Sequence, residues 1–357
     1  MRNRAKIIKI LIVSAFLFSI ASGCKRDKRQ SNEENDLPFN PPSNVVLDPF
    51  EQNKLLARSV NLGNALEAPN EGDWGVTLQD NYFSTIVQAG FTAVRIPIRW
   101  SAHASENPPY SIDPKFMVRT EWAVKKALQN NLAAIINIHH FDSFYASPQT
   151  QKARFIGLWK QIAAHYKNYP DQLFFEVLNE PHDHLDADLW NTYLQEAVHV
   201  IRQSNPTRTL IIGGVQWNSI DALNSLQLPE DDQNIIATFH YYHPFHFTHQ
   251  GAGWVSGSDA WLGTTWSGTE TEKTAVNADL DKAVRWAVEN RRPLFMGEFG
   301  AYSKADMRSR AIWTDYVARQ CETRDISWAY WEFCSGFGVY DPDTDTWRNA
   351  LLRALIP

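Results

Sequence analysis

The chain has 357 residues, of which 44% are hydrophobic, 13% aromatic and 21% charged, and its formal net charge is −6. This composition excludes a fibrous or wholly disordered protein, and the length allows one large domain or two ordinary ones. The acidic balance argues against nucleic acid as a partner, because nucleic-acid-binding domains carry basic surfaces.

The first 24 residues have the features of an export signal. Basic residues precede or enter the apolar stretch 7–20, and the small residues Ala21, Ser22 and Gly23 lead to Cys24. This pattern is typical of a cleaved secretory signal and is too short for a stable transmembrane span. Ala-Ser-Gly-Cys also resembles the bacterial lipobox, although leucine usually stands where Ala21 does. The resemblance implies a lipid anchor on Cys24 and export to a bacterial cell surface or outer membrane; without lipidation the protein would be secreted.

A polar segment separates this signal from the rest of the chain. Residues 24–44 are charged and proline-containing, which predicts a flexible tether, with one catalytic domain over 45–357. Removing residues 1–23, which carry four positive charges and no negative one, would change the formal charge from −6 to −10.

Strand-like and helix-like segments alternate from position 58 onward. Apolar runs of strand length are followed by stretches in which apolar residues recur every three and four positions. The predicted strands are 59–63, 93–98, 133–138, 173–178, 210–213, 235–240, 294–298 and 327–333. The predicted helices include 113–130, 149–166, 189–203, 271–290 and 305–321.

Eight such units predict an α/β fold in which a parallel sheet closes as a single (β/α)8 barrel. The alternative is an open doubly wound sheet, which usually offers a glycine-rich phosphate loop; neither GxGxxG nor GxxxxGK[ST] occurs in the sequence. In a barrel, the carboxyl ends of all strands face one mouth, where active sites lie. The barrel needs no partner to close, so we expect a monomer.

Polar residues stand repeatedly where the apolar strands end. They are Asn61, Asn64, Arg95, His139, His140, Asn179, Glu180, His240, Tyr242, Glu298, Trp331 and Glu332. A packed interior would have to satisfy all of these groups, so a shared site is the better explanation. Two glutamates at two strand ends suit glycoside cleavage, in which one carboxylic acid protonates the leaving oxygen and one carboxylate meets the anomeric carbon.

Seven segments of the chain together resemble glycoside hydrolase family 5, of the cellulase and mannanase kind. They are VNLGNALE at 60–67, VRIPIRW at 94–100, NIHH at 137–140, VLNEP at 177–181, the histidine-rich run 240–254, GEFGAY at 297–302 and WAYWEFCSGFGVYD at 328–341. The likeness covers about 59–356, and FTHQGAGW and YWEFCSGFGVYD resemble a subgroup of bacterial endoglucanases that also attack mannans. It implies a (β/α)8 barrel and a retaining double displacement.

The resemblance also implies roles for individual residues. Glu180 in Asn-Glu-Pro would be the acid/base and Glu298 in Gly-Glu-Phe the nucleophile. Asn179 would bond the sugar 2-hydroxyl, Arg95 would hold Glu298 ionised, and Glu180 would need a raised pKa to keep its proton. The supporting residues would be Tyr242, as a donor to the nucleophile, and His139, His140 and His240, as contacts of substrate or of the carboxylates.

Aromatic and polar residues near the mouth are candidates for sugar binding. Trp331 fits the family's platform under a pyranose ring, and Trp254, in the loop after the sixth strand, is a candidate for a second subsite. Asn64 and Glu67 match family positions that contact sugar before the cleavage point. We expect a β-1,4-glucan, mixed-linkage glucan or glucomannan to be cleaved internally, with mannan as a second activity; a β-mannanase or xyloglucanase is the alternative.

Three other kinds of function fit the sequence less well. His240, His243, His246 and His249 recur every third residue, but Pro244 interrupts the run and no carboxylate joins it, so no metal or cofactor is expected. A serine hydrolase would need GxSxG, which is missing. A non-catalytic glycan-binding lipoprotein would be expected to lack Asn179 or one glutamate.

Cys321 and Cys334 are expected to lie too far apart to form a disulfide, beyond the limit of about 7 Å between bridged alpha carbons.

Overall fold

The computed structural model describes residues 42–357. The predicted signal, Cys24 and nearly all of the tether lie outside these residues. No helix within the described range is both long and apolar enough to cross a membrane. Ser43, within the predicted tether, contacts the folded domain: its N–H donates to Asp171 Oδ2 and its carbonyl accepts from Thr207 Oγ1, both at 2.8 Å.

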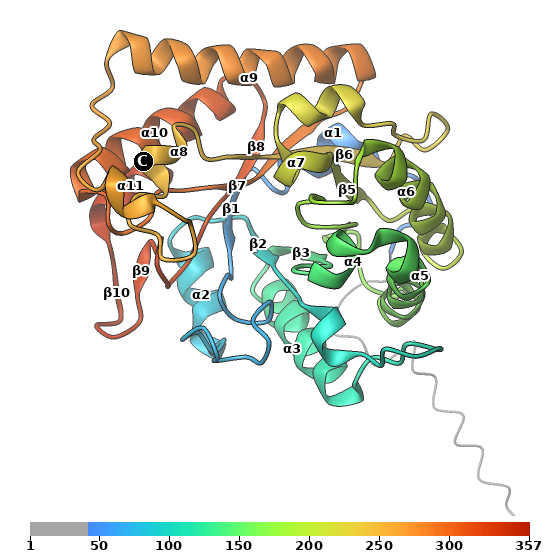
Figure 1. Ribbon diagram of the computed structural model, residues 1–357. Helices are drawn as coiled ribbons and strands as arrows, with labels where there is room; N and C mark the ends of the chain where they lie inside the picture. The colour runs from blue at the N-terminus through green and yellow to red at the C-terminus, as the bar shows by residue number, and fades with distance from the viewer. Residues whose placement is uncertain (1–41) are drawn as a thin grey trace, which may run out of the picture. The chain divides into compact units, whose positions relative to one another are not determined.

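Eight parallel strands close into a barrel in chain order, which confirms the predicted fold class. Each strand pairs with the next along the chain, and β8 pairs back to β1 with Ser59 opposite Ala329. Figure 1 shows the helices arranged around these strands. The strands are β1 (Arg58–Asn61), β2 (Ala93–Ile96), β3 (Ala133–Asn137), β4 (Leu173–Glu176), β5 (Leu210–Gly213), β6 (Ile235–Tyr241), β7 (Leu294–Phe299) and β8 (Ser327–Tyr330).

The five predicted helices correspond to the long helices of the structure, within a few residues at each end. These are α3 (Pro114–Gln129), α5 (Pro148–His165), α6 (Ala187–Arg202), α9 (Glu270–Asn290) and α10 (Met307–Glu322). The start of α9 is fixed by a capping box in which Thr269 and Glu272 bond each other's backbone N–H.

Shorter elements escaped prediction because they span too few turns to show a clear period. The short helices are α1 (Pro49–Lys54), α2 (Asp80–Gln88), α4 (Asp142–Ala146), α7 (Val215–Asn218), α8 (Phe245–Thr248) and α11 (Asn349–Leu355). The 3₁₀ turns are η2 (Trp100–His103), η3 (Asp221–Ser225) and η4 (Ser258–Trp261), and β9 (Tyr340–Asp341) pairs with β10 (Thr346–Trp347) as a small hairpin.

The interior of the barrel is apolar at one end and polar at the other. Side chains two apart on a strand point to the same face, so Ala93 is followed inward by Arg95, and Phe174 by Glu176. The apolar end is filled by Leu56, Ala93, Ala133, Ile135, Phe174, Ile211, Ile236, Phe295 and Ala329, all buried. The polar groups therefore collect at the carboxyl ends of the strands, as a barrel active site requires.

A bulge in β7 places one catalytic candidate beside another. Phe239 of β6 lies opposite Met296 of β7, but the next residue, His240, lies opposite Glu298, so Gly297 is the extra residue. A Cβ at Gly297 would lie 3.0 Å from His240 Nε2. Glycine thus lets the imidazole pack against the strand, while the bulge turns Glu298 toward it.

The two cysteines of the described domain do not form a disulfide, as expected. Cys321 lies on α10 with its thiol 3.8 Å from Met296 Sδ, and Cys334 follows β8; both are buried free thiols. Burial raises the pKa of both thiols, so they stay protonated.

Candidate active site

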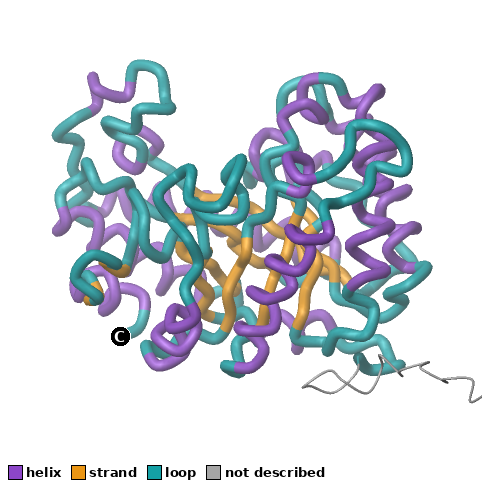
Figure 2. Tube along the Cα trace, turned by 90° about the horizontal axis from the view of Figure 1, so that it is seen from below, coloured by secondary structure: helices purple, strands orange, loops and turns teal. Residues whose placement is uncertain are grey.

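A cleft of about 690 Å³ opens at the carboxyl ends of the barrel strands. Figure 2 shows the strands side-on, with long loops gathered beyond this end. The predicted site residues that line the cleft are Asn64, Glu67, His139, His140, Glu180, Tyr242, Trp254, Glu298 and Trp331. The other three, Arg95, Asn179 and His240, are buried and bond residues of this group.

Glu180 and Glu298 approach each other across this cleft. One carboxylate oxygen of each, together with a ring nitrogen of His240, lie within 4.8 Å of one another. Carboxyl oxygens this close fit a retaining glycosidase, whose carboxyl groups lie about 5–5.5 Å apart, better than an inverting one, at about 6.5–9.5 Å. Glu180 reaches this position from a left-handed backbone (φ 44), four residues beyond the end of β4.

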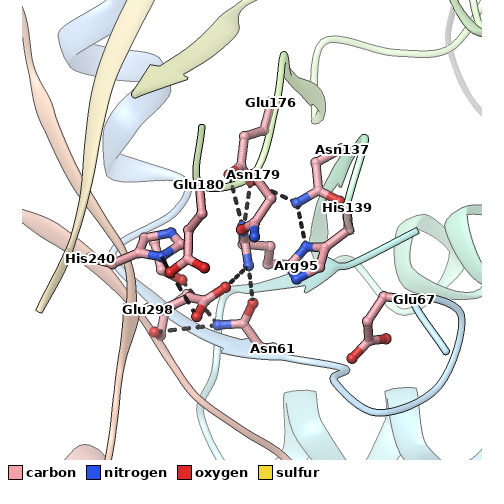
Figure 3. A network of polar contacts seen from close by, with 12 residues as sticks. Asn61, Glu67, Arg95, Asn137, His139, Glu176, Asn179, Glu180, His240 and Glu298 are labelled. Atoms are coloured by element: carbon pink, nitrogen blue, oxygen red, sulfur yellow. Dashed lines mark hydrogen bonds and ion pairs between the residues drawn. The ribbon is translucent and has the colours of Figure 1, made fainter. Parts of the chain in front are cut away.

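Arg95 connects the groups beneath the cleft with all five of its N–H donors (Figure 3). Its Nε and Nη2 bond the two oxygens of Glu176 at 2.6 and 2.8 Å, and Nη2 also donates to Asn179 Oδ1 at 2.7 Å. Its Nη1 donates to Asn61 Oδ1 at 2.8 Å and to Glu298 Oε1 at 2.7 Å. A guanidinium with every donor used has one orientation, and it fixes the positions of its partners.

Glu298 receives donors on both oxygens. Besides the bond from Arg95, Tyr242 donates its hydroxyl to Oε2 at 2.9 Å. Burial raises the pKa of Glu298 above its ordinary value, although His240, Arg95 and the bond from Tyr242 act in the opposite direction. Arg95 favours the ionised form of Glu298 but only partly offsets the effect of burial.

Among residues 42–357, Glu180 has no ion pair with a lysine or arginine. Its Oε1 lies 2.7 Å from His240 Nδ1, and burial raises the pKa of Glu180 to about 7, with Arg95 opposing the change. Burial also lowers the pKa of His240 to about 4, so that ring is neutral at pH 7. Glu180 is thus the carboxyl group that keeps a proton near neutrality. Glu298 accepts hydrogen bonds on both oxygens, and these bonds favour its ionised form.

Trp331 forms one wall of the cleft with the two neighbouring histidines. Its ring lies nearly parallel to that of His139, with centroids 6.0 Å apart, and His139 packs edge-on against His140 at 4.5 Å. Gly63 makes room for the indole, because a Cβ there would lie 2.9 Å from Trp331 Cη2. Burial lowers the pKa of both histidines, which leaves neutral rings that can donate or accept hydrogen bonds.

Glu67 and Trp254 line other parts of the cleft. Glu67 is buried and accepts N–H bonds from Asn64 and Ala65, and burial raises its pKa to about 8. Trp254 is 63% exposed and packs edge-on against Tyr302 at 4.9 Å. Their contacts with sugar remain predictions.

Several residues of the site were missed from the sequence. Glu176 lies inside an otherwise apolar strand. The signal that could have indicated it is Arg95, a cation inside another apolar strand that needs a buried carboxylate as its partner. Trp74, 39% exposed, reaches the cleft from the β1 loop and packs against His140 at 5.5 Å. Glu332, which the sequence grouped with the mouth, is buried and accepts N–H bonds from Cys334, Ser335 and Phe337, so it holds the loop rather than facing the cleft.

The run of four histidines does not converge on one point. His240 contacts Glu180, His249 is buried against Phe245, and His243 and His246 are exposed. Within residues 42–357, Glu180, His240 and Glu298 are the one set of His, Cys, Asp or Glu side chains close enough to hold a metal ion. Arg95 and Tyr242 already occupy both oxygens of Glu298, a donor set that suits a carboxylate nucleophile rather than a metal ligand.

The sequence profile described as Cellulase (glycosyl hydrolase family 5) matches residues 58–336. The chain belongs to this family. Among curated proteins it is 35% identical over 323 residues to Endoglucanase H of Acetivibrio thermocellus, covering 88% of this chain and 34% of that protein. Crystal structures of Thermotoga maritima Cel5A with mannotriose and with cellobiose are 51% and 52% identical to it; each has a TM-score of 0.85 and covers 87% of this chain and 100% of its own. The chain thus spans about a third of the length of Endoglucanase H and corresponds to the whole of the solved Cel5A chains.

Proposed function

We propose that this family 5 protein is an endo-acting, retaining β-1,4-glucanase in which Glu298 is the nucleophile and Glu180 the acid/base. The observation that supports it most is the close pair of carboxyl groups in different surroundings. Glu298 has donors on both oxygens, one of them the Arg95 guanidinium, whereas the contacts of Glu180 are the neutral groups of His240 and Asn179 and its pKa is about 7.

In the first step, a Glu298 oxygen attacks the anomeric carbon as the glycosidic bond breaks. Glu180 gives its proton to the departing sugar oxygen, so neither product leaves as an alkoxide. The new bond joins the sugar to Glu298, and Glu180 is left as a carboxylate.

In the second step, Glu180 takes a proton from water, and the water oxygen attacks the anomeric carbon from the side that the first product left. The bond to Glu298 breaks, the carboxylate is regenerated and Glu180 again holds a proton. Two inversions at the same carbon give net retention.

Asn179 and Trp331 would stabilise the sugar between these steps. Since Asn179 Oδ1 accepts from Arg95, the amide NH₂ remains as a donor for the sugar 2-hydroxyl, a bond that strengthens in the oxocarbenium-like transition state. Trp331 offers a flat apolar face for the axial hydrogens of a pyranose.

We propose β-1,4-glucan, mixed-linkage glucan or glucomannan as the substrate, with mannan as a second activity. The names of the relatives include an endoglucanase and a Cel5A bound to either cellobiose or mannotriose. Glucose and mannose differ at one hydroxyl, and a site that accepts either loses only modest discrimination. A β-mannanase or xyloglucanase of the same fold is the alternative.

A reducing-sugar assay across carboxymethylcellulose, lichenan, glucomannan, galactomannan and xylan tests this assignment. We expect hydrolysis of the three glucose-containing polymers, abolished by Glu298→Gln with polysaccharide binding intact. Activity confined to galactomannan would show that the protein is a mannanase and not a glucanase. Binding without hydrolysis in the native chain would indicate the glycan-binding lipoprotein instead.

We also propose that the mature protein is monomeric and anchored at the bacterial surface through lipid on Cys24. Ser43, near the start of the part of the chain that the structure describes, bonds the segments just before β4 and β5, at the opposite end of the barrel from the cleft. Radiolabelled palmitate should enter the full-length protein in a bacterial host but not the Cys24→Ala variant. Equal labelling of both, or of neither, would refute the anchor.

A further inference from the structure

Asn218 is a buried amide that contacts His240, the histidine beside Glu180 and Glu298. It ends a turn after β5 in which Gln216, Trp217 and Asn218 all have positive φ (53°, 56° and 55°). The turn folds the amide over Gly213, where a Cβ would lie 2.3 Å from Asn218 Oδ1. The backbone N–H of Trp217 donates to the carbonyl of Pro181 at 3.3 Å, so this turn is also tied to the residue that follows Glu180.

The one hydrogen bond of this amide among the described residues is with His240. Asn218 Nδ2 lies 3.4 Å from His240 Nε2, and Asn218 Oδ1 has no partner within residues 42–357. A fully buried amide with a single bond is costly, because a buried polar atom without a partner loses its hydration. Packing alone therefore does not explain why an asparagine stands at this buried position, and its contact with the imidazole suggests a role at the site.

The contact determines where His240 carries its proton. A neutral imidazole has one N–H and one bare nitrogen, and the hydrogen bond at one nitrogen sets the state of the other. Since the NH₂ group of Asn218 can only donate, Nε2 must accept and the proton must lie on Nδ1. Nδ1 faces both glutamates, at 2.7 Å from Glu180 Oε1 and 3.6 Å from Glu298 Oε2.

We propose that Asn218 is a positioning residue: by fixing His240 in the Nδ1–H form, it keeps the acid proton of Glu180 on the oxygen that is free to meet the substrate. The proposal rests on the acid/base role of Glu180 given above. When Nδ1–H donates to Oε1, the proton of the carboxyl group must lie on Oε2. If the proton of the imidazole moved to Nε2, the bare Nδ1 would accept the carboxyl proton and hold it away from the glycosidic oxygen.

Two variants and a matched control test this role. Asn218→Asp keeps the shape and the left-handed backbone but replaces the donor by an acceptor, which draws the imidazole proton to Nε2. Asn218→Gly removes the amide without backbone strain. Gln216→Gly is the control, because Gln216 has the same backbone conformation on the same turn but is exposed.

The readout compares a substrate that needs the acid with one that does not. Cellotetraose must have its leaving oxygen protonated, whereas 2,4-dinitrophenyl β-cellobioside releases a phenolate that needs no proton. We expect both Asn218 variants to lose at least about tenfold in kcat/KM on cellotetraose and less than about twofold on the aryl substrate, since acid catalysis contributes about 10²–10⁴ in total. Gln216→Gly should match the native enzyme on both. Equal losses on the two substrates would overturn the proposal.

Glu180→Ala in the same assay separates this proposal from the function on which it rests. If Glu180→Ala shows the selective loss and the Asn218 variants do not, only the role of Asn218 fails; if Glu180→Ala loses both activities equally, the acid assignment itself fails. Nitrogen NMR of histidine-labelled native enzyme decides the tautomer even if the variants fold poorly. A proton on Nδ1 of His240 supports the proposal, and a proton on Nε2 overturns it.

Discussion

Arg95 and Glu176 form a two-point ion pair inside the barrel, with both side chains fully buried. The remaining donors of Arg95 reach Asn61, Asn179 and Glu298. The position of Glu298, the proposed nucleophile, therefore depends on Glu176, which has no role in the proposed bond-breaking steps.

Glu176→Ala should destabilise the protein because it leaves the buried guanidinium with fewer charge partners. Removing one member of a buried pair typically costs about 3–5 kcal/mol, and we expect a loss of about 3 kcal/mol in the free energy of unfolding because Glu298 remains. Urea unfolding measures this change. Glu196→Ala breaks the surface pair with Lys152 and should change it by less than about 1 kcal/mol. Equal effects from the two variants would contradict the role of the pair.

The rate should fall on both sides of a pH optimum that lies below about 7. Glu180 must be protonated, so kcat/KM should decline as pH rises through about 7. Glu298 must be ionised, so kcat/KM should also decline as pH falls through its pKa, which burial raises above the ordinary value. The pH profile of kcat/KM reports both groups. A rate that stays constant to pH 9 would contradict the assignment of Glu180 as the acid.

Tyr242→Phe should shift the acid side of this profile upward. The variant removes the hydroxyl that donates to Glu298 Oε2, so the pKa of Glu298 rises further and kcat should fall by tenfold or more, since hydrogen bonds to charged groups contribute about 1.5–3 kcal/mol. Tyr241→Phe is a matched control, because that neighbouring hydroxyl donates to Asp279 instead. The same shift in both variants would show that general disturbance of β6 is responsible.

Gly63→Ala should weaken substrate binding without unfolding the barrel. The added methyl group would meet the Trp331 ring at 2.9 Å and displace the indole from its place beside His139. We expect KM to rise severalfold while the melting temperature changes little. Gly253→Ala, with no atom within 4 Å of the added Cβ, should leave both quantities unchanged. An unaltered KM in Gly63→Ala would mean that Trp331 does not support the sugar.

The barrel could be predicted because its signals are local. Short apolar runs gave the eight strands, and polar residues at their ends indicated Glu180 and Glu298. Strand ends were less accurate: β4 stops at Glu176, not at 178, because the chain leaves the ladder and reaches a left-handed conformation at Glu180.

The residues that position the catalytic candidates could not be predicted, because their roles depend on contacts between segments far apart in the sequence. The run around Glu176 was interpreted as uniformly apolar, although the two-residue period turns this carboxylate inward toward Arg95. The bulge at Gly297 and the turn that carries Asn218 leave no periodic signal. Trp74 lies in a loop whose path is set by tertiary packing.

The most direct test of the account is to trap the glycosyl-enzyme. A 2-deoxy-2-fluoro-β-cellobioside with a good leaving group should form a stable adduct, and peptide mass spectrometry should locate it on Glu298. An enzyme that turns over the native substrate but forms no adduct, or forms one on another residue, would contradict the central claim that Glu298 attacks the sugar.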